Sequence, residues 1–123
     1  MDTNALSAFA EGDRSALRAM QAARSFVLPV IVMGEYLFGI RQSVRRKHIE
    51  SWFQDFLQSV RLLSVDPRTA HFYAEIRIEL KSIGKPIPSN DLWIAALARQ
   101  HDYPILTRDR HFDRITGITV QDW

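Results

Sequence analysis

Apolar residues recur at helical spacing along much of the chain. In the stretch from residue 44 to residue 60, one stripe of the predicted helix carries Ile49, Trp52, Phe53, Phe56, Leu57 and Val60. A second stripe, in a helix predicted over residues 67–83, is formed by Tyr73, Ile76, Leu80 and Ile83. The same spacing predicts further helices over residues 4–10, 13–23, 33–43 and 89–102.

Polar residues at the starts of these stretches are placed to cap helices. Asp13 and Asp66 each precede a helical stretch, and Pro67 suits the first position of a helix. Ser89 or Asn90 is expected to cap the helix over residues 89–102.

Short apolar runs separate the helices and predict strands. The continuous run FVLPVIV, residues 26–32, is typical of a strand buried on both faces. The runs RLLSV, YPILT and GITVQDW predict three more strands, and residues 109–115 predict a short helical turn. Because strands that alternate with helices form βαβ units, the pattern indicates an α/β fold with a parallel sheet. No repeat or linker interrupts it, so we expect a single domain over residues 1–123.

Composition narrows the class of protein. With 46% hydrophobic and 24% charged residues, the chain is typical of a globular protein. The absence of cysteine excludes a disulfide framework and a thiolate metal site. The longest apolar run, residues 26–33, is shorter than the ~20 residues that span a membrane. The first residues lack the basic start of a signal peptide, so we expect a soluble, cytoplasmic protein without membrane association.

Four acids fall where strands give way to helices. Asp2 precedes the first helix, Glu35 follows the run 26–32, Asp91 lies in the first turn of the helix over 89–102, and Asp109 follows YPILT. Ligands of open parallel sheets bind beyond the carboxyl ends of the strands, so a parallel fold can bring these acids to one edge.

Each acid alone has a simpler explanation. Asp91 in a first helical turn favours the helix dipole, and Asp109 stands among Arg108, Arg110 and Arg114, with which it can form salt bridges. Glu35 is harder to explain in this way, because it interrupts the apolar stretch VIVMGEYLFGI, where an unpartnered carboxylate is costly. The four together are therefore more informative than any one of them.

Carboxylates that converge on one point repel each other unless a cation neutralises them. Apart from His111, no histidine or cysteine stands near the four acids, which favours the oxygen-preferring ions Mg²⁺ or Mn²⁺. Such ions bind phosphate and activate water. Without these four, 14 − 4 = 10 acids oppose 16 basic residues, so the remaining surface is basic and suits a polyanion. Thirteen of the 16 are Arg, a bias that favours phosphate but also arises from genomic base composition.

Four segments carry a resemblance to a known family: DTNALS, VMGEYLFGI, PSNDLWIAALA and ILTRDRHFDRITGITVQDW. Together they resemble a PIN domain and, more narrowly, the VapC-type toxins of bacterial toxin–antitoxin pairs. The resemblance implies a three-layer α/β/α sandwich and a Mg²⁺- or Mn²⁺-dependent endoribonuclease. It also implies an RNA substrate, a cognate antitoxin and a homodimer.

The resemblance also implies roles for individual residues. Asp2, Glu35, Asp91 and Asp109 match the metal-binding acids, with Glu35 ligating or orienting the attacking water. Asn4 and Thr107 match supporting polar positions. Asp113 matches an outer acid, although capping or pairing with Arg110 or Arg114 explains it better.

Further residues are candidates for contacts with RNA or protein. Arg45, Arg46, Arg108 and Arg110 are predicted phosphate contacts. Trp52 and Phe56 either belong to a core-facing stripe or line a contact with a second copy or an antitoxin.

The start of the chain departs from the family pattern, in which an apolar strand precedes the first acid and lies in mid-sheet. Here only Met1 precedes Asp2. The first strand is thus expected to be missing or truncated: the true start lies upstream, the fold is damaged, or another segment fills its place. This departure keeps a non-catalytic PIN-like binding module open as an alternative. An aspartyl-phosphate phosphatase is a further rival, but Lys81 and Lys85 are poorly placed for it.

Overall fold

The computed structural model describes residues 1–23 and 26–123. Its helices are α1 (Thr3–Ala10), α2 (Arg14–Ala22), α3 (Val30–Arg41), α4 (Arg46–Leu57), α5 (Pro67–Ser82) and α6 (Ser89–His101). Its strands are β1 (Val27–Pro29), β2 (Arg61–Leu63), β3 (Ile105–Leu106) and β4 (Val120–Gln121), and η1 (Arg110–Arg114) is a short 3₁₀ turn. Each helix and strand predicted from the pattern has a counterpart, which confirms the α/β class.

The apolar run at residues 26–32 is where the prediction is most in error. Only Val27–Pro29 is a strand, and α3 begins at Val30, three residues earlier than expected. Pro29 has no N–H to donate to a sheet, so it ends the strand. Beyond it, Val32, Tyr36 and Ile40 are buried at a spacing of four residues, a helical period hidden inside a continuous apolar run.

Side-chain caps fix the starts of two helices as predicted. The Asp13 carboxylate accepts from the Ala16 N–H at 2.9 Å, and Asp66 forms a capping box with Thr69. The predicted cap of α6 is wrong, because Pro88 stands at the N-cap position and neither Ser89 nor Asn90 provides a cap. Ile83, placed by the pattern on the apolar stripe of the helix over residues 67–83, follows the end of α5 and is 55% exposed.

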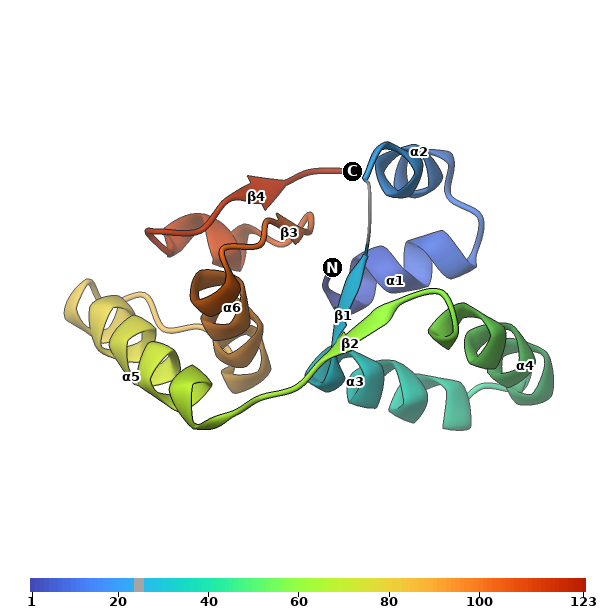
Figure 1. Cartoon of the computed structure of the whole chain (residues 1–123), viewed down its shortest axis with the longest axis horizontal. Helices are drawn as coiled ribbons and strands as arrows, with labels where there is room; N and C mark the ends of the chain where they lie inside the picture. The colour runs from blue at the N-terminus through green and yellow to red at the C-terminus, as the bar shows by residue number, and fades with distance from the viewer. Residues whose placement is uncertain (24–25) are drawn as a thin grey trace.

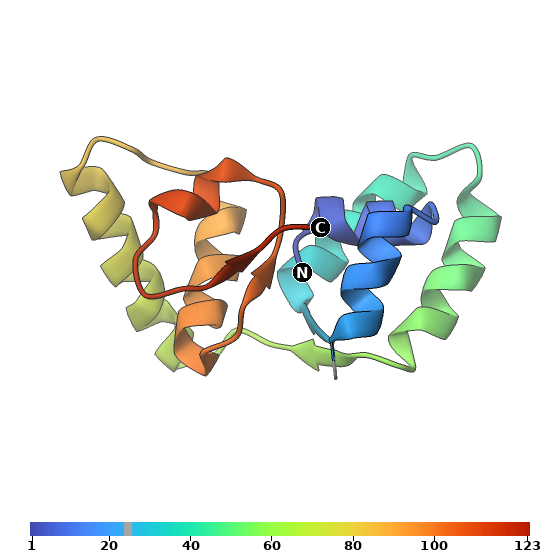
Figure 2. The same ribbon diagram turned by 90° about the horizontal axis from the view of Figure 1, so that it is seen from above.

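The strands form two separate parallel pairs. β1 pairs with β2 through the register Val27↔Arg61 to Pro29↔Leu63, and β3 pairs with β4. Within residues 1–23 and 26–123 no strand joins the two pairs. Figures 1 and 2 show β3 and β4 with α5 and α6 in one half of the molecule, and β1 and β2 with α1 to α4 in the other.

A cleft of about 750 Å³ lies between the two strand pairs. Its lining includes Met1 and residues of β1, β2, β3 and α6. The Asp2 N–H donates to the Leu106 carbonyl at 3.1 Å, so the first residues of the chain reach only one end of β3. No described segment fills the central position of the sheet, as expected from the departure at the start of the chain.

One apolar core nevertheless joins both halves. Helix α6 is buried along most of its surface, through Leu92 and every residue from Ile94 to Ala98. It packs against α5 on one side and contacts α3 on the other. In the described residues, no helix combines the length and apolar character needed to cross a bilayer.

Candidate metal centre

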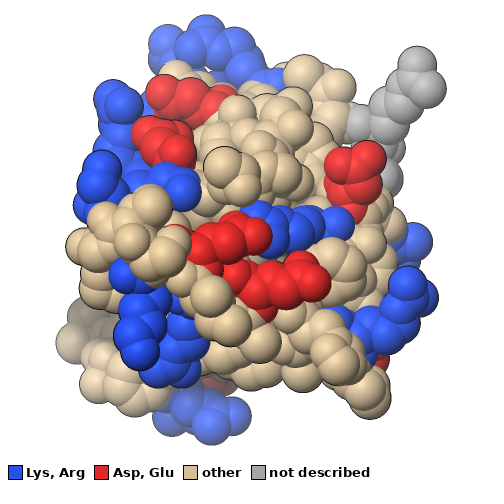
Figure 3. Space-filling view, turned by 90° about the vertical axis from the view of Figure 1, so that its left-hand side faces the viewer, with Lys and Arg blue, Asp and Glu red and all other residues tan. Residues whose placement is uncertain are grey.

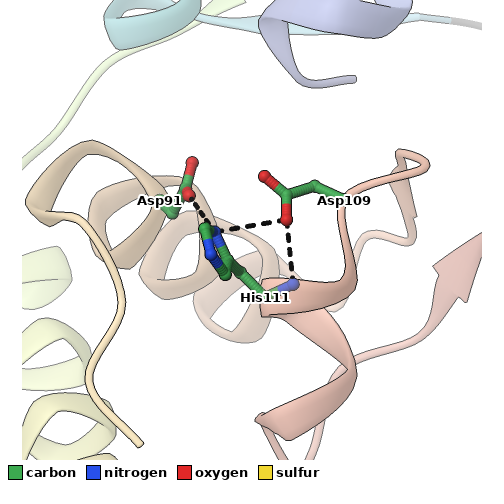
Figure 4. A group of neighbouring side chains, drawn as sticks. All are labelled: Asp91, Asp109 and His111. Carbon is green, nitrogen blue, oxygen red and sulfur yellow. Dashed lines mark hydrogen bonds and ion pairs between the residues drawn. The ribbon is translucent and has the colours of Figure 1, made fainter.

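Two carboxylates and an imidazole meet beside the start of α6. Nδ1 of His111 lies 3.2 Å from Oδ2 of Asp91 and 3.2 Å from Oδ1 of Asp109. One ligand atom from each of the three residues lies within 4.8 Å of the others. Figure 4 shows the two carboxylates facing each other with the imidazole beside them.

Short local structures bring these three side chains together. Asp91 occupies the first turn of α6, where a negative charge is favoured by the helix dipole. The Asp109 carboxylate caps the η1 turn by accepting from the His111 N–H at 2.9 Å. Phe112, fully buried, anchors that turn to the core, and His111 is thereby held beside α6.

Asp2, the first of the four acids, is buried, with 5% of its surface exposed. Its Oδ1 accepts from the Ala5 N–H at 2.9 Å and so caps α1. Its Oδ2 accepts from the hydroxyl of Thr107. The same hydroxyl accepts from the Asp109 N–H at 2.9 Å. Thr107 therefore connects the first of the four candidate acids, Asp2, to the last of them, Asp109.

Glu35 reaches the site from the middle of α3. Burial raises the pKa of its carboxyl, and the negative charges of Asp91 and Asp2 raise it further. The side chains of Thr3 and Asn90 lie close to the carboxylate and oppose this rise. Asn90 therefore stands beside the Glu35 carboxylate, and it provides no cap for α6.

The pKa of Asp91 is raised as well, first by burial and then by the charges of Asp109 and Asp2, against the opposing effect of His111. The structure therefore brings Asp2, Glu35 and Asp109 each within electrostatic reach of Asp91. Two neighbouring carboxylates, Glu35 and Asp91, whose charged forms are disfavoured until a cation arrives, fit a hard divalent ion, and the single nitrogen donor is compatible with Mn²⁺.

The supporting positions differ in what they contact. Thr107 is fully buried and central, whereas Asn4 is exposed. Asp113 is exposed and lies 3.6 Å from Arg110, so the pairing interpretation describes its contacts. Thr3 and Asn90 were not predicted as site neighbours, because a single hydroxyl or amide beside a helix start carries no distinctive pattern.

The four candidate phosphate contacts have different surroundings. Arg46 pairs with Glu50 at 2.8 Å, and Arg108 lies over the Trp123 ring and pairs with Asp122 at 3.2 Å. The Arg110 side chain is 92% exposed. Arg45, which has no ion pair within the described residues, lines a groove of about 610 Å³ that also contains Glu35. Arg45 is therefore the arginine that shares a groove with a site acid.

The outer face of the molecule at α5 carries charged side chains of both signs. Figure 3 shows acidic side chains near the middle of this face, with Lys and Arg around and between them. Mixed charge attracts a polyanion weakly, so this face is a poor candidate for RNA.

Trp52 and Phe56 take part in an aromatic cluster within the chain. Their rings stack at 5.2 Å, and Phe9 packs on both. Phe56 is 9% exposed and Trp52 is half-buried on the edge of the same groove as Arg45. These contacts agree with the core-facing stripe, and a role for either side chain in association stays a prediction.

The sequence model of the PIN domain family matches residues 1–118. The chain belongs to the PIN domain family. A relative from Sinorhizobium fredii, named VapC ribonuclease Y4jK, is 30% identical over 98% of this chain and 93% of its own length.

Solved structures agree with the assignment to PIN domains. The structure of VapBC-1 from nontypeable Haemophilus influenzae matches with a TM-score of 0.86 and 27% identity, over 99% of this chain and 95% of that chain. VapBC2 from Rickettsia felis, bound to a DNA fragment from its promoter, matches with a TM-score of 0.89 over 99% of this chain and 96% of that one. At 24% identity, the second match supports the fold alone. The three-layer α/β/α architecture is confirmed.

Proposed function

We propose that this PIN domain is a metal-dependent endoribonuclease and the toxin of a toxin–antitoxin pair. The observation that carries the proposal is the meeting of Asp91, Asp109 and His111. Asp2 is close enough to raise the pKa of Asp91, and Asp91 is close enough to raise the pKa of Glu35. Relatives with the names Ribonuclease VapC2 and tRNA(fMet)-specific endonuclease VapC support the reaction class.

In this proposal Asp91 and Asp109 hold Mg²⁺ or Mn²⁺, together with Glu35 and Asp2. When bound, such an ion polarises a phosphodiester and lowers the pKa of a bound water. Glu35 lies on α3, whereas Asp91 lies on α6 and Asp109 caps η1. This position on a separate element suits Glu35 to orient the attacking water. Asp2 keeps lone pairs beyond those that accept from Ala5 and Thr107, so a role as ligand remains open to it.

The partners follow from the same relatives. The neighbour from Haemophilus influenzae is a VapBC complex, and another solved neighbour, from Klebsiella pneumoniae, is described as a toxin–antitoxin complex. We therefore propose a cognate antitoxin as the protein partner of this chain. A homodimer, a cytoplasmic location and one domain over residues 1–123 stay predictions.

Calorimetric titration of Mn²⁺ tests the metal site before any RNA is chosen. We expect the unmodified chain to bind Mn²⁺ and Asp91→Asn to abolish binding, because the amide removes a charged ligand from the centre of the group. Asp55→Asn is the matched control, since Asp55 is exposed on α4, away from the site. A folded chain that binds no Mn²⁺ contradicts the proposal.

RNA cleavage tests the reaction itself. Initiator tRNA is the first substrate to try, because a relative from Salmonella typhimurium, 29% identical over 76% of this chain, is named for it. Glu35→Gln is expected to lose cleavage while retaining RNA affinity. Unchanged behaviour of that variant favours the alternative of a non-catalytic PIN-like binding module.

A further inference from the structure

His111 is the one nitrogen donor in the described acidic group. Its Nδ1 is equidistant, at 3.2 Å, from a carboxylate oxygen of Asp91 and one of Asp109. The side chain is 38% exposed, so the imidazole lies at the mouth of the group and not in the core. Figure 4 shows the ring edge that carries Nδ1 directed at both carboxylates.

Local structure holds the imidazole in this place. The His111 N–H donates to Asp109 at 2.9 Å, and the next residue, Phe112, is fully buried. Ile115, also buried, fixes the other end of the turn. The histidine therefore stands on a segment anchored at both ends, which limits how far its ring can withdraw from the carboxylates.

The spacing of the three donor atoms suits a shared cation. An octahedral ion with bonds of about 2.1 Å holds neighbouring ligand atoms roughly 3 Å apart, close to the two 3.2 Å separations. A neutral imidazole with its proton on Nε2 offers the Nδ1 lone pair in that direction. Without a cation, the opposite tautomer can donate from Nδ1 to the same oxygens.

We propose that His111 is a nitrogen ligand of the metal at this site and biases the site toward Mn²⁺ over Mg²⁺. This inference rests on the proposed metal-dependent function and deepens it. Imidazole nitrogen suits transition-metal ions, whereas Mg²⁺ prefers oxygen ligands and retains its waters. An all-carboxylate site discriminates less between the two ions than a site that adds one nitrogen.

Pulsed electron paramagnetic resonance of the Mn²⁺-loaded chain tests the ligand directly. Hyperfine coupling from a directly bonded ¹⁴N nucleus is expected, and selective ¹⁵N labelling of histidine should convert it to a ¹⁵N pattern. This measurement needs no substitution, so it does not depend on whether a variant folds. Bound Mn²⁺ without nitrogen coupling overturns the inference.

Calorimetry with both ions then tests selectivity. His111→Gln replaces the nitrogen donor with an amide of similar reach that offers oxygen. We expect its affinity for Mn²⁺ to fall on the order of tenfold, with a smaller change for Mg²⁺. His71→Gln is the matched control, because His71 is exposed on α5. A rise in Mn²⁺ affinity on His111→Gln would mean that the imidazole competes with the ion for the carboxylates, and it would overturn the inference.

The outcomes separate this inference from the proposed function. Nitrogen coupling in a chain that cleaves none of the tested RNA supports His111 as a ligand and counts against the nuclease. If the Mn²⁺-loaded chain cleaves RNA but shows no nitrogen coupling, the nuclease proposal is supported and His111 is not a ligand. If the folded chain binds neither ion, both proposals fail.

Discussion

The Thr107 hydroxyl is a single group whose hydrogen bonds involve two acids of the candidate site. It donates to the Asp2 carboxylate and accepts from the Asp109 N–H, and its side chain is fully buried. A buried polar group that loses its partner costs about 1–3 kcal/mol, so the bonds of this one hydroxyl matter for both stability and the orientation of Asp109.

Thr107→Val is accordingly expected to lower the free energy of unfolding by about 1–3 kcal/mol and to weaken Mn²⁺ binding. Valine keeps the shape of threonine but leaves the Asp109 N–H and the Asp2 carboxylate without this partner. Chemical denaturation measures the first effect and calorimetry the second. Thr107→Ser is the control: it loses one methyl group, worth about 0.8 kcal/mol, and keeps the hydroxyl. Equal Mn²⁺ affinities in the two variants would contradict this role.

Glu35 and Asp91 make the metal-free protein sensitive to pH. Their pKa values are raised above the ordinary 4.5 and 3.8, so the folded chain retains protons that the unfolded chain has released. Between the ordinary and the raised pKa values the unfolded state binds fewer protons, and the stability of the folded state falls as pH rises. Above the raised pKa values the loss of folding stability has reached its full size and no longer changes with pH.

Glu35→Gln should remove part of this loss. In the absence of metal we expect the variant to melt a few degrees higher than the unmodified chain at pH 7, with a smaller decline in Tm as pH rises from about 4.5. Thermal unfolding followed by circular dichroism across this range measures both quantities. Glu75→Gln, at an exposed position of α5, is the control and should leave the profile unchanged. A lower Tm for Glu35→Gln at neutral pH would show that the carboxylate is not disfavoured by its surroundings.

At the scale of elements, the pattern predicted each helix and strand but not every boundary. Helical period and capping acids located α2 and α5 closely, because these signals are local. The error at Pro29 arose because a continuous apolar run does not distinguish a buried strand from a buried helix. Asn90 of α6 lies close to Glu35 of α3, and no local pattern reports the proximity of distant segments. The four acids were predicted as a group because strand ends in a parallel fold share an edge, whereas no such rule points to Thr3 and Asn90.

The cleft between β1 and β3 has the lining expected of a position for one more strand. It is lined by apolar residues of both strand pairs and of α6, and Met1 lies at its wall. Burial lowers the pKa of the Met1 amine, so the charged form of that group is disfavoured where it stands. An edge strand with unpaired peptide groups accepts an additional strand readily.

An extended apolar segment of about five residues, fused before Met1, is therefore expected to stabilise the chain. Such a segment spans roughly 17 Å and would pair with both inner edges while replacing the amine by a peptide group. We expect a gain of at least about 1 kcal/mol, or roughly 4 °C in Tm. A Gly/Ser extension of equal length is the control, because it removes the same charge without apolar burial. Equal Tm values for the two extensions would mean that the cleft does not bind a strand.

At the scale of the whole molecule, the net charge of +2 is small, but the charged side chains are unevenly distributed. Acids gather at the candidate metal centre, and four of the described arginines, Arg46, Arg99, Arg108 and Arg110, pair with carboxylates. Arg99 binds both oxygens of Glu79, at 2.9 and 3.2 Å, and thereby joins α5 to α6. The long-range attraction for RNA therefore depends on those arginines that no carboxylate neutralises and that lie near the site.

Arg45 and Arg46 are adjacent in sequence yet should contribute unequally to RNA binding. Arg45 lines the groove that contains Glu35, whereas Arg46 pairs with Glu50 at 2.8 Å. Each phosphate contact with a single strand contributes about 0.7 to the slope of log affinity against log salt. In the cleavage-deficient Glu35→Gln background, Arg45→Gln should weaken RNA binding at low salt and reduce this slope by about that amount. Arg46→Gln is the matched control and should change the slope less, because its charge is already opposed. Fluorescence anisotropy over a salt series measures both slopes, and a larger effect at Arg46 would place the RNA outside the groove.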